Sequence, residues 1–328
     1  MPFDVVTFGE AMVRLSPPQF RRLEQTRNLD LFVGGAELNT AVALAKLGRK
    51  SAWVSRLTRN PLGRLIANHG REAGVDIEHV VWTDNDRIGV YFLEFGAAPR
   101  ASSVLYDRKD SAIAHIGPGM VPWAKVFAGA RWFHVTGITP ALSPTAADAS
   151  AEALKAAKAA GLRTSIDLNY RAKLWSPAEA GRRMTEFMPY CDVLITTEED
   201  VDKVFQIKGD NYEAVAALVA KRFSLKVVAI TLRENPLVWK NSWTAMAYAE
   251  GTVYRTNTYE VEIVDRLGAG DSFAAGFIHG MLDGNLQRSL DYGVAVSALK
   301  HSIPGDFAWV TPEEVEGLLK GGGLRISR

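Results

Sequence analysis

Short apolar runs alternate with amphipathic segments along most of the chain. The apolar runs, which predict buried strands, lie at 4–9, 51–57, 131–135, 163–168, 192–196 and 227–232. Helical spacing of apolar positions predicts helices at 36–47, 61–73, 144–160, 177–188 and 212–223. Gly48 and Gly74 follow two of these helices as C-terminal stops, and Ser176-Pro177-Ala178-Glu179 has the capping-box pattern of a helix start. The repeated strand–helix units predict a three-layer α/β/α fold, in which helices cover both faces of a mostly parallel sheet.

Two segments depart from this alternation. Residues 89–95 and 103–107 predict a β-hairpin around residues 96–99. With strands from 13–33, this hairpin would form a small β-sheet that projects from the main domain. We therefore expect an α/β domain of residues 1–11, 36–87 and 110–328, and a small β unit of residues 12–35 and 88–109. A surface hairpin without a role is the alternative.

The composition excludes several classes of protein. Of the 328 residues, 47% are hydrophobic and 23% are charged, and the net charge of +1 gives no general attraction to nucleic acid or membranes. No apolar run is long enough to span a bilayer, and residues 1–15 lack the pattern of a secretory signal. The single cysteine, Cys191, excludes an internal disulfide and fits a reducing compartment, so we expect a cytoplasmic protein. The six histidines lack ligand spacing, and a zinc site is not expected.

The segment Gly268-Ala269-Gly270-Asp271, followed by a run of small residues that predicts a helix, carries the clearest chemical signal. Glycines let backbone N–H groups approach an anion, and a helix start adds unsatisfied donors and a positive dipole end. Asp271 could there stay ionised and take a proton from an attacking hydroxyl. The pattern suits phosphoryl transfer, with Gly268 in the catalytic turn, the backbone N–H groups of Ala269, Gly270 and Asp271 around the transferred charge, and Asp271 as the base. Taken alone, it also fits an ordinary loop-to-helix turn.

A second glycine segment, Gly34-Gly35-Ala36-Glu37-Leu38-Asn39, precedes the helix predicted at 36–47. Together the two segments resemble the paired signatures of the ribokinase-like (PfkB) carbohydrate kinases. Further pieces resemble the 2-keto-3-deoxygluconate kinases in particular: Arg14-Leu15-Ser16-Pro17, Tyr106-Asp107-Arg108, Asp167-Leu168-Asn169-Tyr170-Arg171, Ala298-Leu299-Lys300-His301 and Gly305-Asp306-Phe307. The resemblance covers nearly the whole chain. It implies ATP-dependent phosphorylation of 2-keto-3-deoxygluconate at its terminal hydroxyl, a β-sheet lid over the sugar, and a homo-oligomer formed through that lid.

The resemblance also assigns substrate residues. By position, Gly34, Gly35 and Asn39 would hold sugar hydroxyls, and Tyr91 and Tyr106 would cover the sugar. Arg108 and Arg171 match positions that bind the carboxylate of the sugar acid, a task that suits the planar, two-pronged guanidinium. A surface salt bridge is the ordinary alternative for either arginine.

On the nucleotide side, the matching positions are Thr197, Thr231, Arg233, Glu234, Gly268, Gly270, Ala298 and His301. Thr197 replaces the usual asparagine of a magnesium motif, and Asp200 would contact Mg²⁺ through water. Arg233 and Pro236 stand where many relatives have glycines, which predicts a variant phosphate contact. Asp265 lies where several relatives bind a monovalent cation such as K⁺.

Three competing hypotheses remain. Gly270-Asp271-Ser272 resembles the Gly-Asp-Ser block of serine hydrolases, but Ala274 breaks the nucleophile-elbow pattern. A sugar-acid-binding relative that lost catalysis would account for the altered nucleotide residues, although Asp271 is intact. A kinase for a neutral sugar, such as fructose or ribose, is distinguished from a sugar-acid kinase by Arg108 and Arg171.

Overall fold

The computed structural model describes residues 2–237 and 239–321, apart from the side chains of 233–237. Its main sheet has nine described strands, in the order β14-β13-β12-β11-β10-β9-β1-β4, with β15 paired to β13. The strands are β1 (Val5–Phe8), β4 (Ser51–Val54), β9 (Trp132–Thr136), β10 (Arg163–Asp167), β11 (Val193–Thr196), β12 (Val227–Leu237), β13 (Lys240–Ala249), β14 (Thr252–Arg255) and β15 (Tyr259–Glu262). Pairing is parallel from β12 through β4 and antiparallel around β13.

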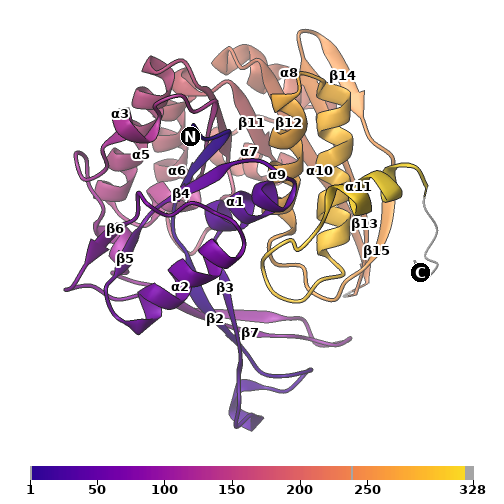
Figure 1. Ribbon diagram of the computed structural model, residues 1–328. Coiled ribbons are helices and arrows are strands. Elements are labelled where there is room, and N and C mark those ends of the chain that lie inside the picture. Colours follow the sequence, from indigo (N-terminus) through magenta and orange to yellow (C-terminus); the bar gives the residue numbers. More distant parts are fainter. Residues whose placement is uncertain (1, 238, 322–328) are drawn as a thin grey trace.

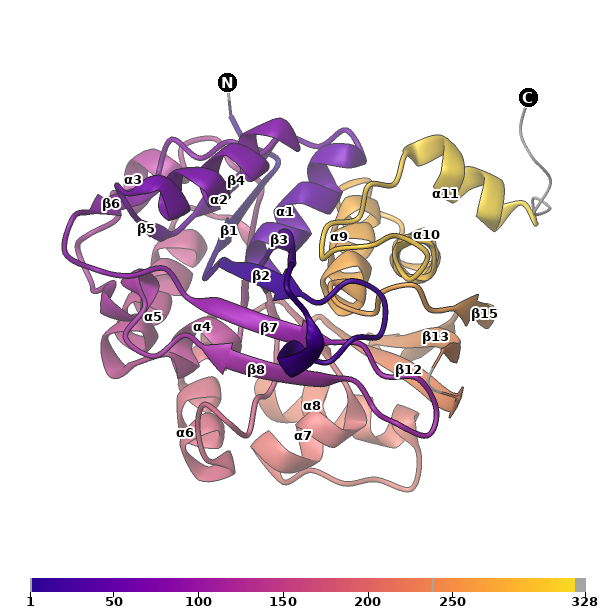
Figure 2. The same ribbon diagram turned by 90° about the horizontal axis from the view of Figure 1, so that it is seen from below.

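Helices cover both faces of this sheet, as Figure 2 shows. One layer contains α1 (Ala36–Lys46), α9 (Ala269–Leu282), α10 (Leu286–Lys300) and α11 (Pro312–Leu319), and the other contains α4 (Ile138–Ala141), α5 (Pro144–Ala159), α6 (Pro177–Phe187), α7 (Glu198–Phe205) and α8 (Tyr212–Phe223). Because neighbouring side chains of a strand point to opposite faces, Val5 packs in the core beneath α1 and α9, and Val6 in the core beneath α5 and α6. The predicted three-layer fold is confirmed.

A second sheet, which we call the projecting sheet, extends from this body (Figure 1). Its order is β3-β2-β7-β8, formed by β2 (Met12–Ser16), β3 (Asp30–Gly34), β7 (Val90–Glu94) and β8 (Ser103–Asp107). The cross-strand register places Arg14 opposite both Phe32 and Tyr91, so these three side chains share one face. That face lies against the main domain, because the Tyr91 hydroxyl donates to Asp306.

The opposite face of the projecting sheet carries a row of apolar side chains. Leu31, Leu15, Phe92 and Leu105 pair in register from β3 to β8. Leu31 is 42% exposed and Leu105 60% exposed, whereas Leu15 and Phe92 are half-buried. We call these four residues the outer row.

Local details differ from the sequence predictions. The strand predicted at 51–57 breaks at Ser55 into β4 and β5 (Arg56–Thr58), and β5 pairs with β6 (Val81–Thr83) in a separate two-stranded sheet. At Ser176 the N–H of Glu179 donates to the serine hydroxyl, but the Glu179 carboxylate binds Arg182 instead of closing the capping box. A reciprocal box forms at Thr311 and Glu314.

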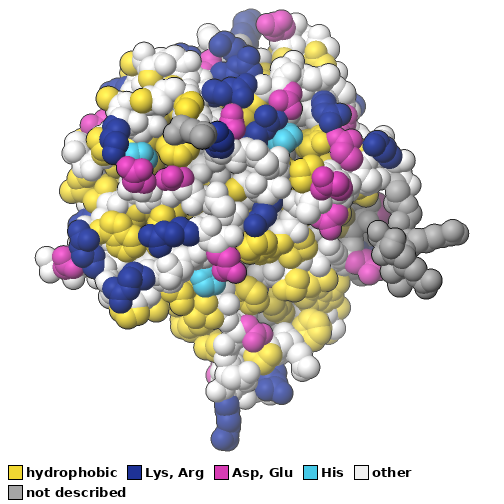
Figure 3. Space-filling view, viewed as in Figure 1, with side chains coloured by type: hydrophobic (Ala, Val, Ile, Leu, Met, Phe, Trp, Pro, Cys, Tyr) yellow, Lys and Arg dark blue, Asp and Glu magenta, His cyan; other side chains and the backbone are white. Residues whose placement is uncertain are grey.

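The remaining described helices are α2 (Pro61–Glu72), α3 (Trp123–Val126) and three 3₁₀ turns, η1 (Leu23–Gln25), η2 (Ala112–His115) and η3 (Met188–Tyr190). Among the described residues, no helix combines the length and apolar composition needed to cross a bilayer. On the face seen in Figure 3, Lys and Arg side chains are interspersed with Asp and Glu, in keeping with the net charge of +1. The surface in this view thus carries no extended patch of one sign.

Candidate active site

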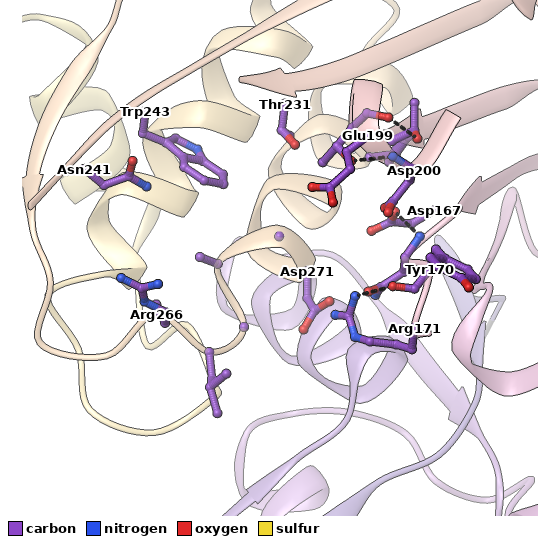
Figure 4. A pocket seen from close by; sticks show the side chains of 18 of the residues that line it. Asp167, Tyr170, Arg171, Glu199, Asp200, Thr231, Asn241, Trp243, Arg266 and Asp271 are labelled. Atoms are coloured by element: carbon purple, nitrogen blue, oxygen red, sulfur yellow. Dashed lines mark hydrogen bonds between the residues drawn. The ribbon is translucent and has the colours of Figure 1, made fainter. Parts of the chain in front are cut away.

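A cavity of about 400 Å³ opens where strands of the parallel sheet end. Asp167, labelled in Figure 4, is the last residue of β10. Thr196 is the last residue of β11, and both residues line the cavity. The start of α9 forms another wall. Ligands of open α/β sheets bind outside the carboxyl ends of the strands, so this cavity is the candidate active site.

The first turn of α9 has the geometry of an anion site. Gly268 caps the helix with φ of 80°, and a Cβ at this position would lie 2.0 Å from the carbonyl oxygen of Asp306. A Cβ on Gly270 would meet nothing within 4 Å, because this residue borders the cavity. The first N–H groups of a helix have no intrahelical acceptor, and the helix dipole places partial positive charge on them. This wall of the cavity therefore suits a phosphate group.

Asp271 is the third residue of α9 and is held from α1. The amide of Asn39 donates to the Asp271 carboxylate at 2.7 Å, and the hydroxyl of Thr40 donates to its backbone oxygen at 3.3 Å. Burial raises the pKa of Asp271 to about 6, while the hydrogen bond from Asn39 and the charge of Arg171 oppose this rise. The carboxyl group is thus ionised at neutral pH, yet basic enough to accept a proton from a hydroxyl.

Four carboxyl groups, those of Asp167, Glu199, Asp200 and Asp271, line the same cavity as Arg171 (Figure 4). Burial and the negative charges of Asp200 and Asp271 raise the pKa of Asp167 to about 8, against the charge of Arg171. Burial likewise raises the pKa of Asp200. Among the described residues, no three His, Cys, Asp or Glu side chains form a metal site of their own. These carboxyl groups nevertheless suit a cation that is also held by phosphate oxygens and water, because a bound cation favours their ionised forms.

The expected sugar-binding residues surround Asp271 and Asp306. Gly34 packs so closely that a Cβ would lie 2.5 Å from the Asp306 side chain, and a Cβ on Gly35 would lie 2.0 Å from the backbone oxygen of Glu10. The Tyr91 hydroxyl donates to Asp306 at 2.7 Å. The ring of Tyr106, which is 38% exposed, lies 5.8 Å from that of Tyr91.

The two arginines assigned to a substrate carboxylate have different partners in this structure. Arg171 lines the cavity and donates to the backbone oxygen of Tyr170 at 3.0 Å. Arg108 forms an ion pair with the buried Glu10, which also accepts a hydrogen bond from Ser111. Arg108 is therefore already paired through one nitrogen of its guanidinium, whereas its Nε has no hydrogen-bond partner among the described residues.

Only some of the residues expected to bind the nucleotide line the cavity. Thr197, Thr231, His301 and the glycines of the α9 turn line the cavity, although the Thr197 hydroxyl also accepts the N–H of Asp200 as the cap of α7. Ala298 lies outside this cavity, in a small apolar cluster with Val261 and Ile263. The side chains of Arg233 and Glu234 fall outside the described residues.

Several residues to which the sequence analysis gave no role belong to the site. Asp306 accepts a hydrogen bond from Tyr91 and packs closely against Gly34 and Gly268. The sequence analysis named it only as part of the motif Gly305-Asp306-Phe307. Trp243 lines the end of the cavity away from Arg171, with its ring 5.2 Å from that of His301 (Figure 4). It comes from β13, a strand that the sequence analysis did not predict.

Comparison with known proteins extends this picture. The chain is 40% identical to a 2-dehydro-3-deoxygalactonokinase of Haloferax volcanii over 100% of both chains. It matches the crystal structure of a 2-dehydro-3-deoxygluconokinase from Thermotoga maritima with a TM-score of 0.95 and 45% identity, covering 98% of this chain and 99% of that one. A putative ribokinase II from E. coli, solved with ATP and Mg²⁺, shares the fold at 21% identity and a TM-score of 0.86, covering 97% and 99% of the two chains.

The family model of the pfkB carbohydrate kinases matches residues 3–307. That range includes both glycine segments, the projecting sheet and every described wall of the cavity. The chain therefore belongs to the pfkB family of carbohydrate kinases.

Proposed function

We propose that this protein transfers the γ-phosphoryl group of ATP to the terminal hydroxyl of 2-keto-3-deoxygluconate. The observation that carries the proposal is the position of Asp271, which lies at the start of α9 beside an open anion site and is held by Asn39. Its pKa of about 6 suits a general base.

The proposed step is a direct transfer. Asp271 accepts the proton of the sugar hydroxyl as that oxygen bonds to the γ-phosphorus, while the bond between this phosphorus and the leaving oxygen of ADP breaks. Backbone N–H groups of the first turn of α9 stabilise the charge on the transferred group. Catalysis therefore depends mainly on positioning and on fixed dipoles.

ATP and Mg²⁺ are the proposed cosubstrate and cofactor. The distant relative solved with ATP and Mg²⁺ supports this choice, as do the carboxyl groups of Asp167 and Asp200 at the cavity, whose ionised forms a bound cation would favour. Mg²⁺ binds through one or two carboxylates together with phosphates and water, which fits this small set. Asp200 remains the proposed water-mediated contact.

Two observations support a substrate with a carboxylate group: the position of Arg171 in the cavity, and the sugar acids named for two similar proteins. Both similar proteins act, by name, on 2-dehydro-3-deoxy sugar acids, one on the galactonate and the other on the gluconate. Arg171 lies beside Asp271 in the cavity (Figure 4), so a carboxylate bound there would be close to the transfer site. We propose that Arg108 joins it when the projecting sheet closes as a lid.

The proposed assembly is a homo-oligomer formed through the projecting sheet, in the cytoplasm. The outer row supports this surface, because it is a contiguous row of apolar side chains whose two ends, Leu31 and Leu105, are exposed, and exposed apolar patches mark association sites. The buried thiol of Cys191, whose pKa burial raises to about 12, fits a reducing compartment.

The test of the proposed chemistry is Asp271→Asn. This change preserves shape but removes the proton acceptor, so turnover with 2-keto-3-deoxygluconate should fall about 10²–10⁴-fold while binding of ATP and sugar stays near normal. ADP release and calorimetric binding measure the two quantities. Near-normal turnover in this variant would remove Asp271 from the mechanism.

A further inference from the structure

The family resemblance predicts a monovalent cation at Asp265. The oxygen atoms of Asp265, however, already accept hydrogen bonds from other groups of the protein. One carboxylate oxygen accepts the N–H of Leu267 at 3.0 Å, and the other accepts the N–H of Gly305 at 3.0 Å. The guanidinium of Arg14 lies 2.7 Å from this second oxygen. The backbone oxygen of Asp265 accepts a hydrogen bond from the ammonium of Lys300 at 3.3 Å. These residues do not fit an added cation.

Lys300 itself has the position that such a cation would need. It is the last residue of α10, it is 0% exposed, and its ammonium also donates to the backbone oxygen of Ile303 at 3.0 Å. An ammonium is a compact point charge that binds carbonyl oxygens, as K⁺ does. Burial lowers the pKa of Lys300, and the charges of Asp265 and Asp306 act in the opposite direction.

This buried charge lies next to the α9 turn. Asp265 begins the segment that runs into Gly268, and Gly268 packs on the backbone of Asp306. Both aspartates interact with Lys300. The ammonium also lowers the pKa of Asp271, so its field reaches the proposed base. A positive charge here stabilises the turn and favours negative charge at the anion site.

We propose that Lys300 is a resident cation that replaces K⁺ in this enzyme, so that catalysis needs no added monovalent cation. Lys300 is then a positioning residue, acting through the backbone of Asp265 and the α9 turn. The proposal rests on the kinase activity proposed above.

The first experiment measures the wild-type rate in KCl and in tetramethylammonium chloride at equal ionic strength, with K⁺-free ATP. Equal rates are expected. A rate that requires K⁺ overturns the proposal. If no sugar is phosphorylated in either salt, the proposed function fails, and the stability measurement below still tests the inference.

Variants of Lys300 make the test specific. Lys300→Ala removes the charge and leaves space on the carbonyl oxygens, so activity in tetramethylammonium should fall roughly 10–150-fold and KCl should restore much of it. Lys300→Met removes the charge but fills the space, so KCl should restore little. Lys125→Ala, a matched change at an exposed lysine, should behave as wild type in both salts.

Thermal unfolding supplies a readout that does not depend on activity. Binding of K⁺ to the native state of Lys300→Ala should raise its midpoint relative to tetramethylammonium, whereas wild type and Lys300→Met should show no such difference. If Lys300→Ala folds and neither its activity nor its thermal midpoint depends on K⁺, the proposal is contradicted. If this variant does not fold, the wild-type comparison decides.

Discussion

Two glycines of the α9 turn have different physical roles. Gly268 adopts φ of 80° and packs directly on the backbone of Asp306, so a side chain there meets both strain and collision. Gly270 has space around it and borders the cavity. The first glycine shapes the turn, and we expect the second to keep the anion site open.

Alanine at each position should separate these roles. Gly268→Ala should lower stability by about 1–3 kcal/mol or more, because the left-handed backbone and the contact with Asp306 cannot both persist. Gly270→Ala should keep the thermal midpoint, yet lower kcat/KM about 10²-fold, comparable to losing one oxyanion donor. Thermal unfolding and steady-state kinetics measure both effects. Full activity of a folded Gly270→Ala protein would contradict this account of the anion site.

The pKa of Asp271 predicts a pH dependence. Burial raises this pKa to about 6, and only the ionised carboxylate accepts a proton, so kcat/KM should fall as pH drops through about 6. The hydrogen bond from Asn39 opposes the rise, so Asn39→Ala should move the acid limb of the profile to higher pH. A profile that is flat down to pH 5, or an unmoved limb in Asn39→Ala, would exclude Asp271 as the titrating base.

Individual residues could be singled out from the sequence where their proposed role depends on one short segment. The sequence pointed to Asp271 and the α9 glycines, which line the cavity, because a turn and a helix start form one local pattern. Asp306 and Lys300 act through long-range contacts with Tyr91 and Asp265, and no local pattern encodes such contacts. The pairing of Arg108 with Glu10 likewise joins residues far apart in the sequence.

The projecting sheet is the element that we propose closes over the substrate. Its inner face carries Tyr91 and Arg14, which contact Asp306 and Asp265 of the main domain. If the sheet acts as a lid, sugar binding should slow backbone hydrogen exchange in residues 90–107, because closure orders the hairpin and excludes water. Residues 212–223, in α8, serve as the internal control. Unchanged exchange at saturating sugar would indicate a passive hairpin.

Helices and strands could be predicted where their buried residues recur with a regular helical or strand period in the sequence. The predicted helix at 212–223 matches α8 at both ends, because its core contacts recur at helical spacing. Strand β13 escaped prediction because its buried positions include Asn241 and the small Ala245 as well as Trp243, which gives no clean apolar alternation. The break at Ser55 follows from the pairing of β5 with the distant β6. This pairing is a tertiary contact, which a local sequence pattern does not indicate.

For the whole molecule, the outer row predicts self-association. Light scattering should give a mass of at least twice the 35.9 kDa of one chain. Leu105→Asp should shift the population toward monomer, because it places a charge in the apolar contact. The matched control is Leu218→Asp, on the exposed side of α8, which should leave the mass unchanged. A monomeric wild-type protein, or equal effects of both variants, would reject this interface.

The account as a whole depends on the acid group of the substrate. The most direct measurement is kcat/KM for 2-keto-3-deoxygluconate, its galactonate epimer, fructose and ribose, with wild type and with Arg171→Ala. We expect a clear preference for the acids, and a loss of roughly 10–150-fold toward the acids alone in Arg171→Ala, because a charge-assisted contact of about 1.5–3 kcal/mol disappears. A wild-type enzyme that prefers fructose or ribose, or an Arg171→Ala enzyme that keeps the full acid preference, would contradict the sugar-acid assignment.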